Sequence, residues 1–420
     1  MEKAYLKRIV DSQIEERLQR IGAVLIEGPK WCGKTRTSEE HCSSIVRMQD
    51  PAGNYSNLRL ADAQPSLLLE GDVPRLIDEW QLAPVIWDAV RFEVDERGVP
   101  GQFILTGSSR PPKNPVRHSG AGRISRLSMR PMTLFESLES NGSISLRDLF
   151  EGKEVKGRSD LTIKDLALTL IRGGWPASIG SDEVKATGNM KDFIDAVVNV
   201  DMSEVDDIKR NPDTVKKLLV SLSRNISTTA AITTVEKDMS GDDDTISEKT
   251  VSSYIGALRR LFIVEDLQAW NPSVRSGTSV RTSPKRHFVD PSIAAYMLRT
   301  STQKLLSDLE TFGLLFESLC VRDLRVYSQI MDGEVFHYRD GYGLEADIVI
   351  RLDDGRWAAI EVKLGSSEIE KAAKNLQKLK DTVDVEKMGS PSFLLILTAG
   401  EYGYRRQDGI YIVPIGCLKD

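Results

Sequence analysis

The feature that most constrains this sequence is a glycine-rich segment that directly follows a short apolar run. Residues 28–35 read Gly-Pro-Lys-Trp-Cys-Gly-Lys-Thr, and the apolar residues 23–26 precede them. The pattern G-x-x-x-x-G-K-T works as a phosphate-binding loop when a strand delivers it and a helix begins at its end, because backbone N–H groups and the helix N-terminus then face the phosphates. The sequence therefore predicts an N-terminal P-loop domain of the α/β class.

Each position of this loop has an expected use. Gly28 and Gly33 allow the tight turn, Lys34 is expected to reach the β- and γ-phosphates of ATP, and the Thr35 hydroxyl is expected to ligate Mg²⁺. The whole segment is predicted to surround the nucleotide, with Gly28, Pro29, Lys30, Trp31, Cys32, Gly33, Lys34, Thr35 and Arg36 as its binding residues. The sequence thus predicts ATP and Mg²⁺ as cofactors.

A second apolar run ends in two acids. Residues 75–80 read Arg-Leu-Ile-Asp-Glu-Trp. Apolar residues followed by Asp-Glu, downstream of a phosphate loop, form the Walker B pattern. Asp78 is expected to hold the Mg²⁺ hydration shell, and Glu79 is expected to polarise the attacking water. Together with the loop, this motif indicates ATP hydrolysis.

A third apolar strand, within residues 102–109, ends in small hydroxyl residues. Thr106, and after it Ser108, is a candidate to touch the γ-phosphate or the attacking water, although such residues also simply end buried strands in turns. Farther on, Arg123 follows a glycine pair. It suits an arginine that meets the γ-phosphate on a neighbouring subunit, and the alternatives are a surface arginine or a DNA contact.

The order of these motifs resembles the bacterial and archaeal AAA-type ATPases that carry a C-terminal domain of uncharacterised function. The matching segments are Leu-Ile-Asp-Glu-Trp-Gln at 76–81, Leu-Thr-Gly-Ser-Ser at 105–109 and Gly122-Arg123, and the chain departs from the family at Trp31 and Cys32. The resemblance covers nearly the whole chain. It implies a homo-oligomeric ring, such as a hexamer, and a helical lid that contains the Arg-Gly-Gly-Trp-Pro element at 172–176, with Arg172 as a sensor in cis.

The middle of the chain is expected to form a winged helix. Two short helices are predicted at 228–232 and 247–261, followed by strand-like residues 262–265 and 286–290 around a Gly/Ser/Arg-rich loop. In one interpretation, Ser252, Arg259 and the basic wing at 275–286 touch DNA phosphates. In the other, this domain is a protein-interaction spacer, because fold does not dictate function.

The C-terminal part carries a nuclease-like pattern. Asp347 opens one expected strand, and the two-residue period places Glu361 and Lys363 on one face of the next. Two converging carboxylates could bind Mg²⁺, and a lysine could orient water and stabilise phosphorane charge. This D…E-x-K pattern matches the restriction-endonuclease-like PD-(D/E)xK superfamily, in which Glu317 would be the upstream acid and Gln377 a helper. The alternative is a surface ion-pair cluster.

Length and composition limit the remaining choices. With 420 residues, the chain is predicted to contain an AAA-type core (1–160), a helical lid (161–215), a winged-helix-like domain (216–300) and a restriction-endonuclease-like α/β domain (301–420). A net charge of −6 leaves only local basic stretches, at 110–130 and 275–287, for nucleic acid. No apolar run is long enough to cross a bilayer, no signal peptide is recognised, and four scattered cysteines suit a reducing cytoplasm, so no membrane partner is expected.

Two functions are compatible with these patterns. The first is an oligomeric, Mg²⁺-dependent ATPase coupled to the binding or processing of DNA, branched or single-stranded, with a metal-dependent nuclease at its C-terminal end. The second is a nucleotide-switched ATPase that binds a protein partner in defence or toxin-type regulation, with a catalytically silent nuclease-like platform.

Overall fold

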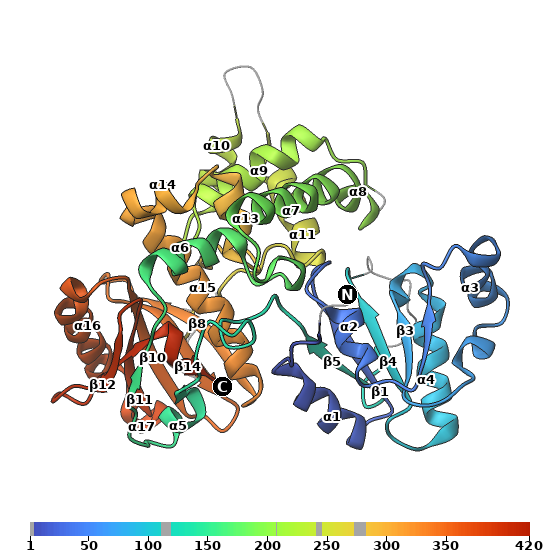
Figure 1. Ribbon diagram of the computed structural model, residues 1–420, viewed down its shortest axis with the longest axis horizontal. Coiled ribbons are helices and arrows are strands. Elements are labelled where there is room, and N and C mark those ends of the chain that lie inside the picture. Colours follow the sequence, from blue (N-terminus) through green and yellow to red (C-terminus); the bar gives the residue numbers. More distant parts are fainter. Residues whose placement is uncertain (1–3, 111–118, 207, 241–245, 273–282) are drawn as a thin grey trace. The chain divides into compact units, whose positions relative to one another are not determined.

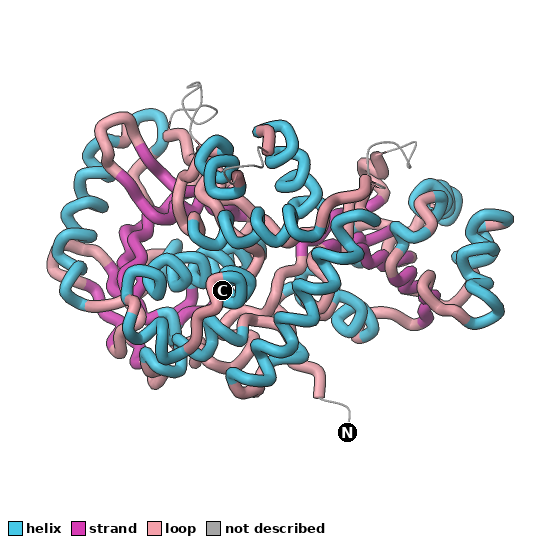
Figure 2. The backbone as a smooth tube through the Cα atoms, turned by 90° about the horizontal axis from the view of Figure 1, so that it is seen from above, coloured by secondary structure: helices cyan, strands magenta, loops and turns pink. Residues whose placement is uncertain are grey.

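The computed structural model describes residues 4–110, 119–206, 208–240, 246–272 and 283–420. The chain divides into two compact units (Figure 1). Unit 1 comprises Met1–Pro131, Asn199–Arg210 and Gly256–Ile263, and unit 2 comprises Met132–Val198, Asn211–Ile255 and Val264–Asp420. In both units strands lie together with helices beside them, as the magenta and cyan segments of Figure 2 show. The α/β class predicted from the sequence is confirmed.

Unit 1 is built on a parallel sheet of five strands in the order β2-β3-β4-β1-β5. The strands are β1 (Ala23–Glu27), β2 (Ser44–Arg47), β3 (Arg75–Asp78), β4 (Phe103–Gly107) and β5 (Ile124–Ser128). The helices assigned to this unit are α1 (Val10–Arg20), α2 (Lys34–Glu39), α3 (Ala52–Ala63), α4 (Val85–Arg97) and the short α8 (Met202–Glu204).

Apolar layers cover both faces of this sheet. Leu25 belongs to one core, with Trp80 and Trp87, whose ring centroids are 5.0 Å apart. Val24 and Ile26 belong to the other core, with residues of α1. Every residue of β1 is buried, as expected for a strand in a parallel sheet covered on both sides. The carboxyl ends of β1, β3 and β4 therefore lie side by side, and they carry the predicted nucleotide motifs.

Unit 2 contains a mixed seven-stranded sheet in the order β7-β12-β13-β11-β10-β9-β8. Its strands are β7 (Gly157–Arg158), β8 (Gly333–Arg339), β9 (Glu345–Leu352), β10 (Trp357–Lys363), β11 (Phe393–Thr398), β12 (Tyr402–Arg405) and β13 (Tyr411–Pro414). The strand β9 runs antiparallel to β8 and β10, whereas β10, β11 and β13 are parallel. Helices α15 (Leu309–Gln329) and α16 (Ile369–Thr382) pack on it, and β6 (Ile144–Ser145) pairs with β14 (Leu418–Lys419) in a separate small sheet.

The rest of unit 2 is helical. Its helices are α5 (Leu146–Phe150), α6 (Ile163–Arg172), α7 (Glu183–Ala196), α9 (Pro212–Arg224), α10 (Ile232–Met239), α11 (Glu248–Arg260, which ends in unit 1), α13 (Pro291–Met297), α14 (Thr302–Ser307) and α17 (Val385–Met388). Local sequence sets several starts: Thr162 and Asp165 form a capping box at α6, and Asn211 caps α9. Among the described residues, no helix is long and apolar enough to span a membrane.

The region of the predicted winged helix differs in detail from expectation. The helix expected at 228–232 begins only at Ile232, because the Thr228 and Ala230 carbonyls accept hydrogen bonds from Arg286. The expected strands at 262–265 and 286–290 form isolated antiparallel bridges, such as Val264 with Phe288. The predicted wing residues Arg275 and Arg281 lie outside the described residues. A winged helix remains a prediction.

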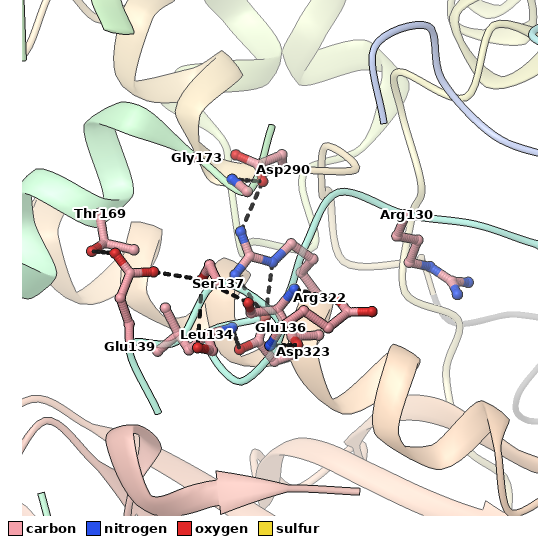
Figure 3. Close-up of polar contacts among 12 residues, drawn as sticks. Arg130, Leu134, Glu136, Ser137, Glu139, Thr169, Gly173, Asp290, Arg322 and Asp323 are labelled. Carbon is pink, nitrogen blue, oxygen red and sulfur yellow. Dashed lines mark hydrogen bonds and ion pairs between the residues drawn. The ribbon is translucent and has the colours of Figure 1, made fainter. Parts of the chain in front are cut away.

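A buried ion network holds the Arg-Gly-Gly-Trp-Pro element at 172–176 in place (Figure 3). Arg322 of α15 donates to Asp290 at 2.8 Å and to Asp323 at 2.8 Å. Asp290 also accepts from the Gly174 N–H at 3.0 Å, and a Cβ at Gly174 would lie 2.1 Å from the Met132 carbonyl oxygen. These contacts fasten the element to α13 and α15. Separately, Arg172 forms an ion pair with Glu139, so this arginine is engaged within unit 2.

Candidate functional site

The predicted phosphate loop lies between β1 and α2, where the motif requires it. A Cβ at Gly28 would lie 2.0 Å from the Met129 carbonyl oxygen, so only glycine fits there. Gly33 has φ 101° at the start of α2, and Trp31 has φ 68°. These left-handed residues produce the tight turn, in which glycine carries no steric penalty.

The loop lysine is held by its own loop. The Lys34 ammonium donates to the Gly28 carbonyl at 3.0 Å and to the Pro29 carbonyl at 2.8 Å. Its side chain is buried although the motif assigns it to phosphates. Carbonyl oxygens are the weaker acceptors for an ammonium, because a phosphate oxygen carries a negative charge and a carbonyl oxygen does not. Phosphate oxygens can therefore draw the ammonium away from the carbonyls.

The predicted Mg²⁺ residues touch each other directly. The fully buried Asp78 carboxylate accepts from the Thr35 hydroxyl at 2.8 Å and from the Thr106 hydroxyl at 2.6 Å. Its second oxygen accepts from the Gln49 amide at 2.7 Å. The hydroxyl of Thr35 and the carboxylate of Asp78 are the hard oxygen donors that Mg²⁺ prefers, so these two residues fit the ion.

Glu79 is positioned by the neighbouring strand β4. Its backbone has φ 58°, and its N–H donates to the Thr106 hydroxyl at 3.0 Å. Its carboxylate accepts from Ser108 at 2.7 Å and from Gln81. Of the two strand-end hydroxyls singled out in the sequence, Thr106 therefore contacts both Walker B acids and Ser108 contacts Glu79. The sequence did not predict the contact of Gln49 with Asp78 or that of Gln81 with Glu79, since neither motif gives these side chains a role.

In unit 2, the three residues of the nuclease-like pattern also come together. Lys363 lies 3.2 Å from the Asp347 carboxylate and 2.7 Å from that of Glu361. Asp347 further accepts from the Val362 N–H at 2.9 Å. Neighbouring strands β9 and β10 supply these residues, as the sequence predicted from their order and period.

Two more side chains complete this carboxylate cluster, defined here as Lys285, Glu317, Asp347, Glu361 and Lys363. Lys285 donates to Glu317 at 2.8 Å and to Asp347 at 3.4 Å, and it is almost fully buried. Glu317 comes from α15, as predicted. Lys285 was instead assigned to the DNA-contacting wing, and no local signal in the sequence indicates its true neighbours. Gln377 donates to the Asp408 carbonyl at 3.5 Å rather than to the cluster.

Burial and ion pairing shift these groups in opposite directions. Burial raises the pKa of Glu317 to about 7 and that of Glu361 to about 7. Burial also acts to raise the pKa of Asp347, but the charges of Lys285 and Lys363 hold it below its usual value. The carboxylates raise the pKa of both lysines although burial opposes this, so both lysines are charged.

This arrangement does not suit a divalent ion. Both oxygens of Asp347 and one oxygen each of Glu317 and Glu361 are taken by ammonium groups. Within the part of the chain that the structure describes, no group of three or more His, Cys, Asp or Glu residues could hold a metal ion. The Mg²⁺ predicted for Asp347 and Glu361 therefore has no open set of donors here.

Comparison with protein families gives one match in the N-terminal part and two in the remainder. The sequence model of the AAA domain matches residues 21–138. Residues 21–138 are therefore similar to the AAA domain and are called the AAA domain below. The match supports an AAA-type ATPase fold for these residues. Two domains of unknown function match the remainder, DUF8612 at residues 163–304 and DUF4143 at residues 312–418.

Individual relatives add little about activity. The uncharacterized proteins Mb2031c of Mycobacterium bovis and Rv2008c of Mycobacterium tuberculosis are each 22% identical over 417 residues, which cover 97% of this chain and 83% of theirs. The Walker-type ATPase PABY2304 of Pyrococcus abyssi has a TM-score of 0.44 at 14% identity, covering 71% of this chain and 97% of that one. The Aeropyrum pernix ORC1 protein in complex with DNA has a TM-score of 0.25 at 13% identity, covering 73% and 95%.

Other loop residues of the AAA domain have partners of their own. Lys30 pairs with Asp201 at 2.7 Å, and Arg36 pairs with Glu40. The Cys32 thiol is buried and lies 3.6 Å from the Met129 carbonyl. Trp31 is 48% exposed, which leaves an aromatic surface at the loop.

The arginines of the predicted basic stretch at 110–130 are largely paired where they are described. Arg110 and Arg126 lie 2.5 and 3.2 Å from the buried Glu27 carboxylate. Arg123 lies 2.7 Å from Asp95, and its side chain is 46% exposed. Lys113, Arg117 and His118 lie outside the described residues. The described part of this stretch is therefore partly neutralised by its own acids.

Proposed function

We propose that the chain is a nucleotide-switched regulatory ATPase whose AAA domain hydrolyses ATP with Mg²⁺. The observation that carries this proposal is the contact of Thr35, Asp78 and Thr106, with Glu79 held beside them. Thr35 and Asp78 would hold Mg²⁺, which would neutralise phosphate charge, while Lys34 binds the β- and γ-phosphates.

Glu79 acts on the attacking water in this proposal. Its carboxylate is hydrogen-bonded to Ser108 and Gln81, so it must exchange one of these contacts to accept a proton from water. Its backbone position depends on Thr106, which also contacts Asp78. The Thr106 hydroxyl thus contacts both Asp78, which would hold the metal, and Glu79, which would act as the base. A change of bound nucleotide and the hydrolysis step would both act on these contacts.

The carboxylate cluster supports a silent platform rather than a nuclease. Two lysines already neutralise its acids. Arg286, expected to touch DNA, is buried and pairs with Asp266 at 2.9 Å. Ser252 and Arg259 are exposed on α11, and their contact with DNA phosphates remains a prediction. We therefore place protein-partner regulation ahead of DNA processing.

ATP-driven DNA processing is the second candidate. The observation in its favour is that Asp347, Glu361 and Lys363 converge as the nuclease pattern requires. In this version, bound DNA or a partner would have to displace Lys285 before a metal could enter.

One assay separates the two candidates. ATP hydrolysis is measured with and without single-stranded, duplex and four-way DNA, and DNA integrity is followed in the same tubes with Mg²⁺ or Mn²⁺. We expect ATP turnover that DNA does not stimulate, and intact DNA. DNA-stimulated turnover together with cutting that Glu361→Ala abolishes would contradict the regulatory proposal and establish a motor nuclease.

We further propose that the chain works as a homo-oligomeric ring in which Arg123 reaches the nucleotide of the neighbouring subunit. Its partial exposure at the end of a glycine turn supports this role. Asp95 would release the guanidinium when the neighbour offers a γ-phosphate, since a surface ion pair contributes only about 0–1 kcal/mol.

A further inference from the structure

The side chain of Lys285 is delivered to the carboxylate cluster by a fixed piece of backbone. Lys285 and Leu267 exchange both backbone hydrogen bonds at 2.9 Å, forming an antiparallel bridge. Two residues beyond Leu267, Ala269 bridges to His337 of β8, the edge strand of the seven-stranded sheet. The lysine is thus anchored beside the sheet that carries Asp347 and Glu361.

Its ammonium lies among the carboxylates of the cluster. It lies between Glu317 of α15 and Asp347 of β9, at 2.8 and 3.4 Å. Only 6% of the residue is exposed. The other lysine, Lys363, bridges Asp347 and Glu361 on the opposite side of the same aspartate. Asp347 therefore has a cation on each oxygen.

Charge explains why a lysine can be kept there. Three carboxylates and two ammonium groups share the cluster, which leaves at most one uncompensated negative charge. A buried ion is tolerated only when it is paired and hydrogen-bonded, and each cation in the cluster contacts two carboxylates. A divalent ion added to the two lysines would make the cluster positive. Lys285 and a divalent ion are therefore alternatives.

We propose that Lys285 is the resident cation of the carboxylate cluster and excludes divalent metal from it. With Lys285 in place, the cluster is complete without an ion. When its ammonium is removed, Glu317, Asp347 and Glu361 keep an excess of buried negative charge, and they become a site for a divalent ion with oxygen ligands. This proposal is independent of ATP hydrolysis by the AAA domain.

The test measures Mn²⁺ binding to the full chain without nucleotide, by electron paramagnetic resonance and titration calorimetry. The Asp78→Asn substitution is included in every protein so that the AAA domain contributes no metal site. We expect Lys285→Met to bind one Mn²⁺ at least about tenfold more tightly than the parent does. Adding Asp347→Asn should abolish the gain, and Lys285→Arg, which keeps the charge, should behave like the parent.

Thermal unfolding provides a second measurement that does not depend on any activity. Lys285→Met should unfold at a lower temperature than the parent, and Mn²⁺ should raise its midpoint while leaving that of the parent unchanged. Lys285→Gln, which retains a polar side chain, serves the same comparison if the methionine variant does not fold.

Two results would overturn the proposal. One is a parent protein that binds Mn²⁺ in a manner abolished by Asp347→Asn, because the lysine would then not exclude the ion. The other is a folded Lys285→Met or Lys285→Gln chain that shows no gain in Mn²⁺ affinity. Neither result bears on ATP turnover, so failure here is distinct from failure of the regulatory ATPase.

Discussion

At the scale of single residues, Thr106 has the most informative contacts of the AAA domain. Its hydroxyl donates to Asp78 at 2.6 Å and accepts from the Glu79 N–H at 3.0 Å. The sequence predicted it as a strand-end hydroxyl that touches the γ-phosphate or the attacking water. The structure shows that it touches both Walker B acids, so its loss should disturb catalysis more than nucleotide binding.

We therefore expect Thr106→Ala to lower kcat by roughly tenfold or more while ATP affinity changes little, because the base loses its support but the phosphate loop remains. Thr106→Ser keeps the hydroxyl and should retain most of the rate. Steady-state kinetics and nucleotide binding measure the two effects separately. A normal kcat in Thr106→Ala would remove this residue from the mechanism.

His337 gives a pH prediction for unit 2. The side chain is fully buried, and burial together with the charge of Lys285 lowers its pKa to about 4. An unfolded histidine titrates near pH 6.5, so the unfolded chain binds more protons between pH 6.5 and 4. The stabilisation is therefore present above pH 6.5 and is lost as pH falls towards 4.

Between pH 6.5 and 4, the free energy of unfolding that is lost through His337 amounts to roughly 3 kcal/mol. His337→Phe cannot take up the proton and should show a shallower loss of unfolding free energy on acidification than the parent. Chemical unfolding at a series of pH values measures both slopes. Equal slopes would show that His337 takes up its proton over the same pH range in the folded and unfolded states.

At the scale of elements, short sequence patterns predicted those loops and strands whose conformation depends on neighbouring residues. The phosphate loop, the Asp78 and Glu79 strand end and the β9 and β10 strands follow from short-range periodicity and glycine placement. Lys285 could not be found in this way, because its partners Glu317 and Asp347 are 32 and 62 positions away. The strand expected at 286–290 is an isolated bridge between Phe288 and Val264.

The Arg322 network shows a long-range constraint that fixes several elements at once. Arg322 is buried between Asp290 and Asp323, and burial raises the pKa of Asp323 to about 6 in spite of that arginine. Arg322→Met would leave two buried carboxylates without their cation. We expect it to lower the unfolding free energy of unit 2 by about 3–5 kcal/mol.

Arg351→Met provides the matched control, since Arg351 is exposed on β9, and we expect its effect to stay within about 0.5 kcal/mol. Denaturant unfolding followed by signals from unit 2 gives both values. A loss at Arg322 no larger than that at Arg351 would mean that the network adds nothing to stability.

At the scale of the whole molecule, the proposed ring makes a prediction about mixed subunits. Lys34→Ala removes phosphate binding but leaves Arg123 intact, whereas Arg123→Ala does the reverse. If Arg123 acts on the neighbouring subunit, each variant alone should be inactive. Their mixture should recover part of the ATP turnover, because some interfaces combine an intact phosphate loop with an intact arginine.

ATP turnover is measured as a function of the mixing ratio. An inactive mixture at every ratio would favour a role of Arg123 in cis or at the surface.

The central claim is that the AAA domain hydrolyses ATP through Glu79 and responds to nucleotide state. The most direct measurement compares ATP binding and phosphate release for the parent, Lys34→Ala and Glu79→Gln in Mg²⁺. We predict that Glu79→Gln binds ATP as the parent does but releases phosphate about 10²–10⁴-fold more slowly, while Lys34→Ala loses both. Phosphate release by Glu79→Gln at the rate of the parent would contradict the account.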